Sequence, residues 1–303
     1  MKFGVIANLT KSAAIPIVSR LVQWLQSESI PCVLEQVLAD ALQQTGVTSD
    51  AAEAGQLAGE VDMVLSLGGD GTLLSTARAI GNRMTPILGI NVGRLGFLAE
   101  VDPDTLHATI SRILDGNYSL EERMVLQATI RGNTSIAPTY ALNDVVVSRG
   151  VLARTVPISV NIGDEYFNTY LADGVIVSTP TGSTAYSLAA NGPIVAPGVD
   201  GIVINPICPH TLAARPVVVD AASHVHIHSE TPGADIQLTV DGTAVAPLRD
   251  VDCVDIQKAD HTVRLVQCGG ARFFDLLRQK LNWDSGIHPQ ERHENQHLFA
   301  DAP

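Results

Sequence analysis

The residues best suited to chemistry form a glycine-rich run, Gly68-Gly69-Asp70-Gly71-Thr72, between an apolar segment and a helix-like segment. Glycine has no Cβ, so the three glycines let the backbone approach a ligand closely and adopt a positive φ. Their N–H groups, with the positive end of the next helix, form a natural cradle for phosphate groups. The run therefore predicts a phosphate-binding turn. The alternative is a tight Gly-Asp-Gly hairpin turn, which the helix-like segment after it disfavours.

Asp70 is the unexpected member of this run, because bound phosphates would repel its carboxylate. Two roles would explain its presence: holding Mg²⁺, or orienting and deprotonating an attacking hydroxyl group. The run is not a Walker A loop, since Gly-Lys occurs nowhere in the chain, and the G-x-G-x-x-G fingerprint of dinucleotide-binding proteins is also absent. A phosphate-handling site outside these two motif classes is therefore indicated.

The pair Asn143-Asp144, which precedes the apolar run from Val145 to Val147, is a second candidate. The carboxylate can accept hydrogen bonds from two neighbouring sugar hydroxyls, and the amide can both donate and accept. Such a pair more commonly caps a turn at the start of a strand. From these residues alone, the structural role is favoured and the sugar-binding role stays open.

A third candidate begins at Asp173-Gly174 and ends at Tyr186. It holds five hydroxyl side chains besides the tyrosine, namely Ser178, Thr179, Thr181, Ser183 and Thr184. They offer many donors in a small space, Ala185 leaves room, and the ring of Tyr186 offers a flat face for a base. Alternatively, Ser183 or Thr184 could N-cap a helix over residues 185–191. The two roles are compatible.

The elements that must position these residues change in type along the chain. Up to about residue 120, apolar strand-like segments alternate with segments of helical periodicity, which predicts a mostly parallel α/β sheet covered by helices. The expected strands are residues 3–7, 61–67 and 86–90, and the expected helices are residues 13–27, 71–80 and 106–114. The glycine-rich run thus lies between a strand and a helix.

From about residue 123 to residue 268, short β-rich runs separated by turn signals such as Asp241-Gly242 predict an all-β domain. After it, Phe273, Phe274, Leu277 and Leu281 line one face of a predicted helix, which we expect to pack back on the first domain. The polar segment from about Trp283 to the end is expected to be loose.

The formal net charge of −13 disfavours binding to nucleic acid, because only four lysines occur and the arginines are scattered. None of the four cysteines forms a C-x-x-C pair, so a reducing compartment is the simpler expectation. The first residues resemble a strand more than a signal peptide, and no apolar run approaches the roughly 20 residues that span a bilayer. We therefore expect a cytoplasmic protein without membrane or nucleic-acid partners.

Two histidine patterns are assigned no metal. His293 to His297 matches H-E-x-x-H, but it lies in a polar tail with almost no chain left for a third ligand. His224, His226 and His228 alternate and would share one face of a strand. No carboxylate or cysteine lies within that run to complete a zinc site, so a solvated strand face is favoured.

Taken together, these segments resemble the bacterial NAD kinases over nearly the whole chain. The run from Gly68 to Thr72 is similar to the GGDGT motif, residues 91–98 to the NxGxLGFL segment, and Asn143-Asp144 to the NE/D motif of that family. Residues 172–186 are similar to its DG…STPTGSTAY motif. Residues 209–212, Asp241-Gly242 and residues 272–281 also match. Several motifs in the right order are far more specific than GGDGT alone, which lipid kinases share.

The resemblance implies a Rossmann-like α/β domain over residues 1–122, an all-β NAD-binding domain over residues 123–268, and a C-terminal helix and tail over residues 269–303. It implies transfer of the ATP γ-phosphoryl group to the 2′-hydroxyl of the adenosine ribose of NAD, which gives NADP. Asp70 would be the catalytic acceptor. The implied nucleotide-binding residues are Gly68, Gly69, Asp70, Gly71, Thr72, Asn143, Asp144, Arg154, Leu171, Asp173, Thr184, Ala185, Tyr186, Ser187, Leu188, Ala189 and Thr243.

The chain departs from the family pattern at two of these positions. Thr243 stands where the family often has a longer amide, and Leu171 replaces an often charged residue. With so few lysines, Mg²⁺ should neutralise much of the triphosphate charge, so magnesium is the expected cofactor. The resemblance also implies a homo-oligomer, dimer or tetramer.

Two other functions compete with this reading. A GGDGT kinase with a lipid or sugar acceptor would be expected to show an apolar entry or a basic membrane patch, and the sequence shows neither plainly. A non-catalytic nucleotide-binding regulator would be expected to lack Asp70 or the Asn143-Asp144 pair, and both are present.

Overall fold

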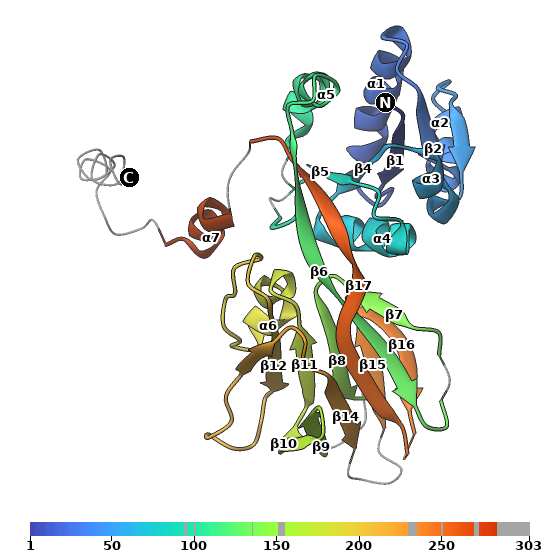
Figure 1. Ribbon diagram of the computed structural model, residues 1–303. Helices are drawn as coiled ribbons and strands as arrows, with labels where there is room; N and C mark the ends of the chain where they lie inside the picture. Colours follow the sequence, from blue (N-terminus) through green and yellow to red (C-terminus); the bar gives the residue numbers. More distant parts are fainter. Residues whose placement is uncertain are drawn as a thin grey trace, which may run out of the picture. The chain divides into compact units, whose positions relative to one another are not determined.

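The computed structural model describes residues 1–93, 96–99, 101–134, 136–150, 155–229, 235–249, 251–269 and 273–283 (Figure 1). Contacts within the chain define two units, Met1–Cys268 and Gly269–Pro303. The first unit contains every sheet among the described residues, and the second contains one helix.

The N-terminal part is a parallel sheet covered by helices, as the sequence predicted. Its strands lie in the order β5-β4-β1-β2-β3. They are β1 (Phe3–Ala7), β2 (Cys32–Glu35), β3 (Asp50–Ala52), β4 (Met63–Gly68) and β5 (Ile87–Asn91). The helices are α1 (Ala14–Ser27), α2 (Gln36–Gln43), α3 (Ala54–Glu60), α4 (Asp70–Ile80) and α5 (Leu106–Leu114), with short 3₁₀ turns at Gly81–Arg83 and Pro103–Thr105. The second and third strands and the second and third helices were not among the predicted elements.

The central strand β1 is buried along its whole length because helices cover both faces of the sheet. Phe3 and Val5 pack in a core with Leu21 of α1, whereas Ile6 packs in a separate core with Leu73 of α4. Successive side chains of a strand point to opposite faces, so one apolar strand supplies both cores. This packing fixes β4 and α4, the two elements that flank the glycine-rich turn.

The β-rich part consists of two sheets around a common core. One is a six-stranded antiparallel sheet in the order β13-β12-β11-β8-β15-β16, and the other continues the N-terminal sheet through the order β10-β9-β14-β17-β5. The strands are β6 (Ser119–Arg131), β7 (Thr139–Ala141), β8 (Asp144–Arg149), β9 (Val156–Ile162), β10 (Glu165–Ala172), β11 (Gly174–Ser178), β12 (Gly201–Ile207), β13 (Val217–Asp220), β14 (Val225–Ser229), β15 (Ile236–Val240), β16 (Thr243–Leu248) and β17 (Cys253–Gln267).

Two long strands join the α/β part to the β-rich part. β6 has 13 residues and β17 has 15, and they pair with each other in antiparallel register. Near its end, β17 also pairs in parallel with β5, where Leu265 lies opposite Ile87. β6 crosses residue 122, where the sequence analysis placed the domain boundary.

In the second unit, α7 (Phe273–Leu281) forms where the helical periodicity predicted it. Its packing against the first domain stays a prediction. The tail predicted to be loose, with its H-E-x-x-H sequence, lies outside the described residues from residue 284 onward. Among the described helices, none is long and apolar enough to span a bilayer.

Candidate functional site

The glycine-rich run is a sharp strand-to-helix turn at the carboxyl end of β4. The strand ends at Gly68 and α4 begins at Asp70. A Cβ at Gly68 would lie 2.0 Å from Oγ1 of Thr72, so only glycine lets the helix start this close to the strand. Thr72 Oγ1 in turn accepts a hydrogen bond from the Gly69 N–H at 3.4 Å. The turn is thus held from within.

One reason given for these glycines is wrong. None of Gly68, Gly69 and Gly71 has a positive φ, and Gly69 is extended at −134°. A Cβ at Gly69 or Gly71 would meet no heavy atom within 4 Å. These three glycines are therefore not needed for a left-handed backbone conformation. They leave the backbone bare beside open space at the N-terminus of a helix, where an anion is favoured.

The carboxylate of Asp70 is aimed by a second loop, which follows β5. Its Oδ2 accepts a hydrogen bond from the Phe97 N–H at 2.8 Å, and its Oδ1 accepts one from the Leu98 N–H at 3.0 Å. A Cβ at Gly96 would lie 1.9 Å from Oδ1, so glycine is required for this approach. Residues 96–98, part of the segment matched to the family without a role, therefore orient the predicted catalytic acceptor.

The pair Asn143-Asp144 stands at the start of β8 and is held by a third carboxylate. Asp241 accepts hydrogen bonds from the N–H groups of Leu142, Asn143 and Asp144 at 2.9, 2.8 and 3.0 Å. Asp241 and Gly242 form the tight turn between β15 and β16, with positive φ at both residues. The turn predicted from Asp241-Gly242 is confirmed. We call its aspartate the clamp, because the carboxylate holds the backbone N–H groups of Leu142, Asn143 and Asp144.

Burial changes the protonation of this cluster. Burial, and secondly the negative charge of Asp241, raise the pKa of Asp144 to about 7. Burial also raises the pKa of Asp241, although three backbone N–H groups and Arg78 act in the opposite direction. Arg78 of α4 donates to Oγ1 of Thr243 at 2.9 Å and to the Val240 carbonyl at 3.2 Å. It thereby connects the helix to the clamp.

A pH dependence of stability follows from Asp144. The folded chain keeps this proton up to about pH 7, whereas the unfolded chain releases it near the ordinary value of 3.8. Between these values the folded state binds more protons, so the free energy of unfolding falls as pH rises and levels off above pH 7. Asp144→Asn has no such proton to lose. Its stability relative to the parent chain should therefore rise by roughly 3 kcal/mol between pH 4 and pH 8.

Urea unfolding at several pH values measures this difference. The matched control is Asp115→Asn, at an exposed aspartate beyond α5, which should show no rise relative to the parent chain. A constant difference between Asp144→Asn and the parent chain at all pH values would contradict the raised pKa.

Most hydroxyls of the predicted loop turn inward. Ser178 donates to the Asn143 carbonyl at 3.2 Å, and Thr179 donates to the Leu142 carbonyl at 2.6 Å. Ser183 is buried and bonds to the backbone of Val195. These three side chains therefore bind the backbone, and two of them, Ser178 and Thr179, hold the segment that carries Asn143 and Asp144.

The predicted helix over residues 185–191 is shorter than expected. A 3₁₀ turn spans Thr181–Thr184, and α6 covers only Tyr186–Ala189. Neither predicted side chain caps it, since Ser183 is used as above and Thr184 donates back to the Thr181 carbonyl at 3.1 Å. This capping prediction is wrong because nearer backbone acceptors compete for both hydroxyls.

A hollow of about 340 Å³ gathers part of the predicted site. Asn143, Asp144, Ala185 and Tyr186 line it, as predicted from the sequence. Tyr186 as a whole residue is 48% exposed, so part of it is open to solvent. The lining that the prediction did not include is Leu74, Val146, Ser148, Thr239, Asp241 and Gly242. Leu74 belongs to α4, so the hollow lies between that helix and the β-rich part.

A second hollow of about 410 Å³ lies at the carboxyl ends of β1 and β2. Ala7, Asn8 and Glu35 line it from the strands, and Gly71, Thr72 and Ser75 line it from α4. Open α/β sheets bind ligands outside the carboxyl ends of their strands. The first two turns of α4 therefore border two hollows, and Asp70 is the residue with which the helix begins.

Other predicted residues lie outside the first hollow. Asp173 forms an ion pair with Arg149 at 2.7 Å, and Leu171 is 45% exposed on β10. Ser187 is buried against Asn205. Gly71 and Thr72 line the second hollow only. The remaining described residues line neither hollow, namely Gly68, Gly69, Asp70, Thr184, Leu188, Ala189 and Thr243, and Arg154 lies outside the described residues. Contact of these residues with nucleotide stays a prediction.

The main residue that the sequence analysis missed as part of the site is Asp241. It was read as a turn signal and a motif match. An aspartate in a two-residue hairpin turn gives no local sign that its carboxylate will accept hydrogen bonds from a segment about a hundred residues earlier. Only the pairing of β15 with β8 brings the two together, with Val240 opposite Val145.

Comparison with known proteins follows the same division of the chain. A family model described as the ATP-NAD kinase N-terminal domain matches residues 3–118, and one described as the ATP-NAD kinase C-terminal domain matches residues 142–268. An NAD kinase of Geobacter sp. (strain M21) is 40% identical over 284 residues, which cover 93% of this chain and 98% of that protein. An NAD kinase of Symbiobacterium thermophilum is 42% identical over 282 residues, covering 93% and 99%.

Two solved structures share the fold. The yeast NADH kinase complexed with NADH has a TM-score of 0.85 at 24% identity, covering 95% of this chain and 89% of that one. The NAD kinase from Archaeoglobus fulgidus in complex with ATP has a TM-score of 0.73 at 22% identity, covering 93% and 99%. The α/β part and the antiparallel β part are therefore arranged here in a known architecture.

Proposed function

The chain belongs to the ATP-NAD kinase family, and from this premise we propose how its two hollows and Asp70 share the work of phosphorylation. The chain is a phosphotransferase that converts NAD to NADP. The proposal concerns which residues hold the acceptor, which hold the donor, and where the proton of the reacting hydroxyl goes.

The acceptor occupies the hollow lined by Asn143, Asp144 and Tyr186, in this proposal. The observation that carries it is the hydrogen bonding of Asp241. Its carboxylate accepts from the N–H groups of Leu142, Asn143 and Asp144, which fixes the Asn143-Asp144 pair at the wall of a hollow of about 340 Å³. A fixed carboxylate beside a fixed amide suits the hydroxyls of a ribose, since together they accept and donate. The exposed ring of Tyr186 supplies a face for an aromatic base.

The donor triphosphate occupies the second hollow, at the carboxyl ends of β1 and β2. The N-terminal end of α4, at Gly71 and Thr72, favours anionic groups there because of the helix dipole. The only acidic lining side chain of this hollow is Glu35, whose pKa is raised by burial and by the charge of Glu53. Mg²⁺, which enters with the triphosphate, would neutralise part of its charge.

Asp70 then acts as the proton acceptor in the reaction between the two ligands. Its oxygens are held by two N–H groups and retain lone pairs that can accept the proton of the ribose 2′-hydroxyl. As that oxygen bonds to the γ-phosphorus, the bond from phosphorus to the bridging oxygen of ADP breaks. The proton moves to the Asp70 carboxylate, and ADP leaves with its negative charge. Positioning supplies most of the acceleration.

Filling the donor hollow tests the assignment of the two ligands. Ser75 is exposed on α4 and lines only the second of the two hollows. Ser75→Phe should raise the KM for ATP roughly tenfold and leave the KM for NAD within about twofold, because it removes donor space alone. Initial rates of NADP formation, varied in each substrate, measure both constants.

The matched control is Ser111→Phe, at an exposed serine of α5, which should change neither constant. A selective rise in the KM for NAD with Ser75→Phe would reverse the assignment. The reaction itself is read by incubating the chain with NAD, ATP and Mg²⁺ and detecting NADP with an NADP-specific dehydrogenase. Omission of Mg²⁺ should abolish the signal.

We also propose a cytoplasmic location and a homo-oligomeric state. Cys32, Cys208 and Cys253 carry free thiols, which suits a reducing compartment. Oligomerisation rests on the family resemblance and is tested by light scattering of the purified chain.

A further inference from the structure

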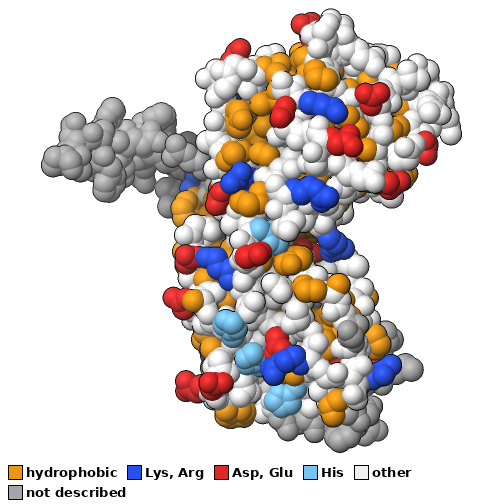
Figure 2. Space-filling model, turned by 45° about the vertical axis from the view of Figure 1, so that its right-hand side comes forward, with side chains coloured by type: hydrophobic (Ala, Val, Ile, Leu, Met, Phe, Trp, Pro, Cys, Tyr) orange, Lys and Arg blue, Asp and Glu red, His pale blue; other side chains and the backbone are white. Residues whose placement is uncertain are grey.

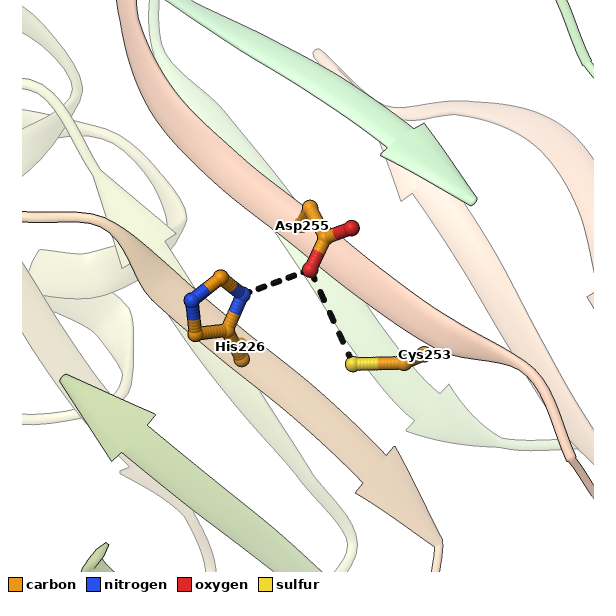
Figure 3. Close-up of side chains that lie close together, drawn as sticks. All are labelled: His226, Cys253 and Asp255. Carbon is orange, nitrogen blue, oxygen red and sulfur yellow. Dashed lines mark hydrogen bonds and ion pairs between the residues drawn. The ribbon is translucent and has the colours of Figure 1, made fainter. Parts of the chain in front are cut away.

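A cluster of three different side chains on the β-rich part plays no role in the proposed reaction. His226 comes from β14, and Cys253 and Asp255 come from β17 (Figure 3). The two strands are antiparallel neighbours, with His226 opposite Asp255 and His228 opposite Cys253. The alternate residues Val225, Ile227, Val254 and Ile256 are buried in the core, so the cluster lies on the outer face of the sheet.

The ligand atoms of the three side chains converge. Nδ1 of His226 lies 2.5 Å from Oδ1 of Asp255, and Sγ of Cys253 lies 3.8 Å from the same oxygen. All three atoms lie within 4.8 Å of one another. On the face seen in Figure 2, histidine side chains gather beside acidic and basic ones on the β-rich part.

From the sequence alone, zinc is disfavoured because the alternating histidines have no carboxylate or cysteine within their run. Strand pairing supplies both, from a segment 27 to 29 residues later, since His226 is followed by Cys253 and Asp255 on the adjacent strand. That reason for rejecting a metal is therefore overturned for His226.

We propose that His226, Cys253 and Asp255 form a binding site for Zn²⁺, with water as the fourth ligand. Imidazole nitrogen, thiolate sulfur and carboxylate oxygen are the three donors that zinc prefers. Tetrahedral coordination separates such donors by about 3.4–3.7 Å. The Cys253–Asp255 contact, at 3.8 Å, is already close to this spacing. The His226–Asp255 contact must open by about 1 Å, which a side-chain rotation on an outer sheet face allows.

Arg131 of β6 is the competitor of the metal. It forms an ion pair with both oxygens of Asp255, and one of its guanidinium nitrogens lies 3.5 Å from Nδ1 of His226 and 3.9 Å from Sγ of Cys253. Its side chain is 67% exposed, so it can turn away into water. Zn²⁺ at this site would join β14 to β17, the strand that continues into the α/β part.

Cobalt binding to the full chain tests the site. Co²⁺ substitutes for zinc, and a bound thiolate gives it a charge-transfer absorption that other ligands do not. The parent chain should show this absorption and lose it when Zn²⁺ is added. His226→Ala and Asp255→Asn should each weaken binding at least about tenfold, and Cys253→Ser should abolish the absorption.

Controls separate this site from other metal-binding side chains. His224→Ala and Cys208→Ser, at exposed positions, should bind as the parent chain does, and so should a variant with both His293 and His297 changed to alanine. Arg131→Gln should bind metal several-fold more tightly, because a competing positive charge is gone.

Two results would overturn the proposal. One is the absence of a cobalt–thiolate absorption in the parent chain and in Arg131→Gln. The other is equal zinc affinity for the parent chain and Cys253→Ser. Either result would leave the three residues as an ion-pair cluster with Arg131 and no metal.

Discussion

Replacing Asp70 by Asn should lower kcat for NADP formation by roughly 10²–10⁴-fold, the usual contribution of a positioned proton acceptor. The amide of Asn cannot take the hydroxyl proton. It also presents an NH₂ group where the carboxylate now accepts N–H bonds from Phe97 and Leu98. The loss should therefore appear in kcat far more than in the affinity for NAD.

Coupled assays of NADP formation measure kcat and KM, and calorimetric titration with NAD measures binding without turnover. Asp104→Asn, at an exposed aspartate before α5, is the matched control and should keep normal turnover. Thermal unfolding shows whether the loop of residues 96–99 still holds α4. Near-normal turnover by a folded Asp70→Asn chain would exclude Asp70 as proton acceptor. A loss of NAD binding without loss of kcat would assign it to the acceptor site instead.

Replacing Asp241 by Ala should destabilise the chain by about 3–5 kcal/mol and abolish most activity. The substitution leaves three N–H groups without an acceptor, at Leu142, Asn143 and Asp144, all of which are buried. Each unsatisfied buried group costs about 1–3 kcal/mol. Alanine also fits the left-handed backbone at residue 241 poorly. Relief of the buried charge offsets part of this cost.

Urea unfolding measures the free energy, and the NADP assay measures the activity. Asp164→Ala, in the hairpin turn between β9 and β10, is the control, because its carboxylate is exposed and should contribute less than about 1 kcal/mol. Asp241→Asn should fall between the parent chain and Asp241→Ala, since its amide oxygen can still accept. If Asp241→Ala were as stable as Asp164→Ala, the clamp would contribute little to the fold.

The two variants distinguish a residue that takes part in phosphoryl transfer from one that holds the NAD-binding residues in place. Asp70→Asn should keep NAD binding and lose turnover, whereas Asp241→Ala should lose both, because it releases the Asn143-Asp144 pair. A chain that loses turnover in both variants but binding in neither would require a different acceptor site.

Local patterns predicted much of the fold. Helical periodicity and short apolar runs predicted α1, α4, α5 and α7, the strands β1, β4 and β5, and the β-rich second half. Each of these helices buries one apolar stripe, so its apolar residues recur every three or four positions. The strands β1 and β4 are buried on both faces, so they appear as short, mostly apolar runs. The elements that were not predicted are β2, β3, α2 and α3. Each is short and carries only a few apolar residues, so its periodicity is brief.

The amino-acid sequence by itself determined the kind of chemistry, because the glycine-rich turn, the Asn143-Asp144 pair and the hydroxyl-rich loop are short motifs whose meaning lies in adjacent residues. Tertiary structure decided which of them meet and what holds them. The loop of residues 96–99 orients Asp70, the turn at Asp241 clamps the pair, and β14 meets β17 to gather three metal-ligand types. Such contacts depend on strand pairing between distant segments, and the side chains involved carry no local mark of their partners.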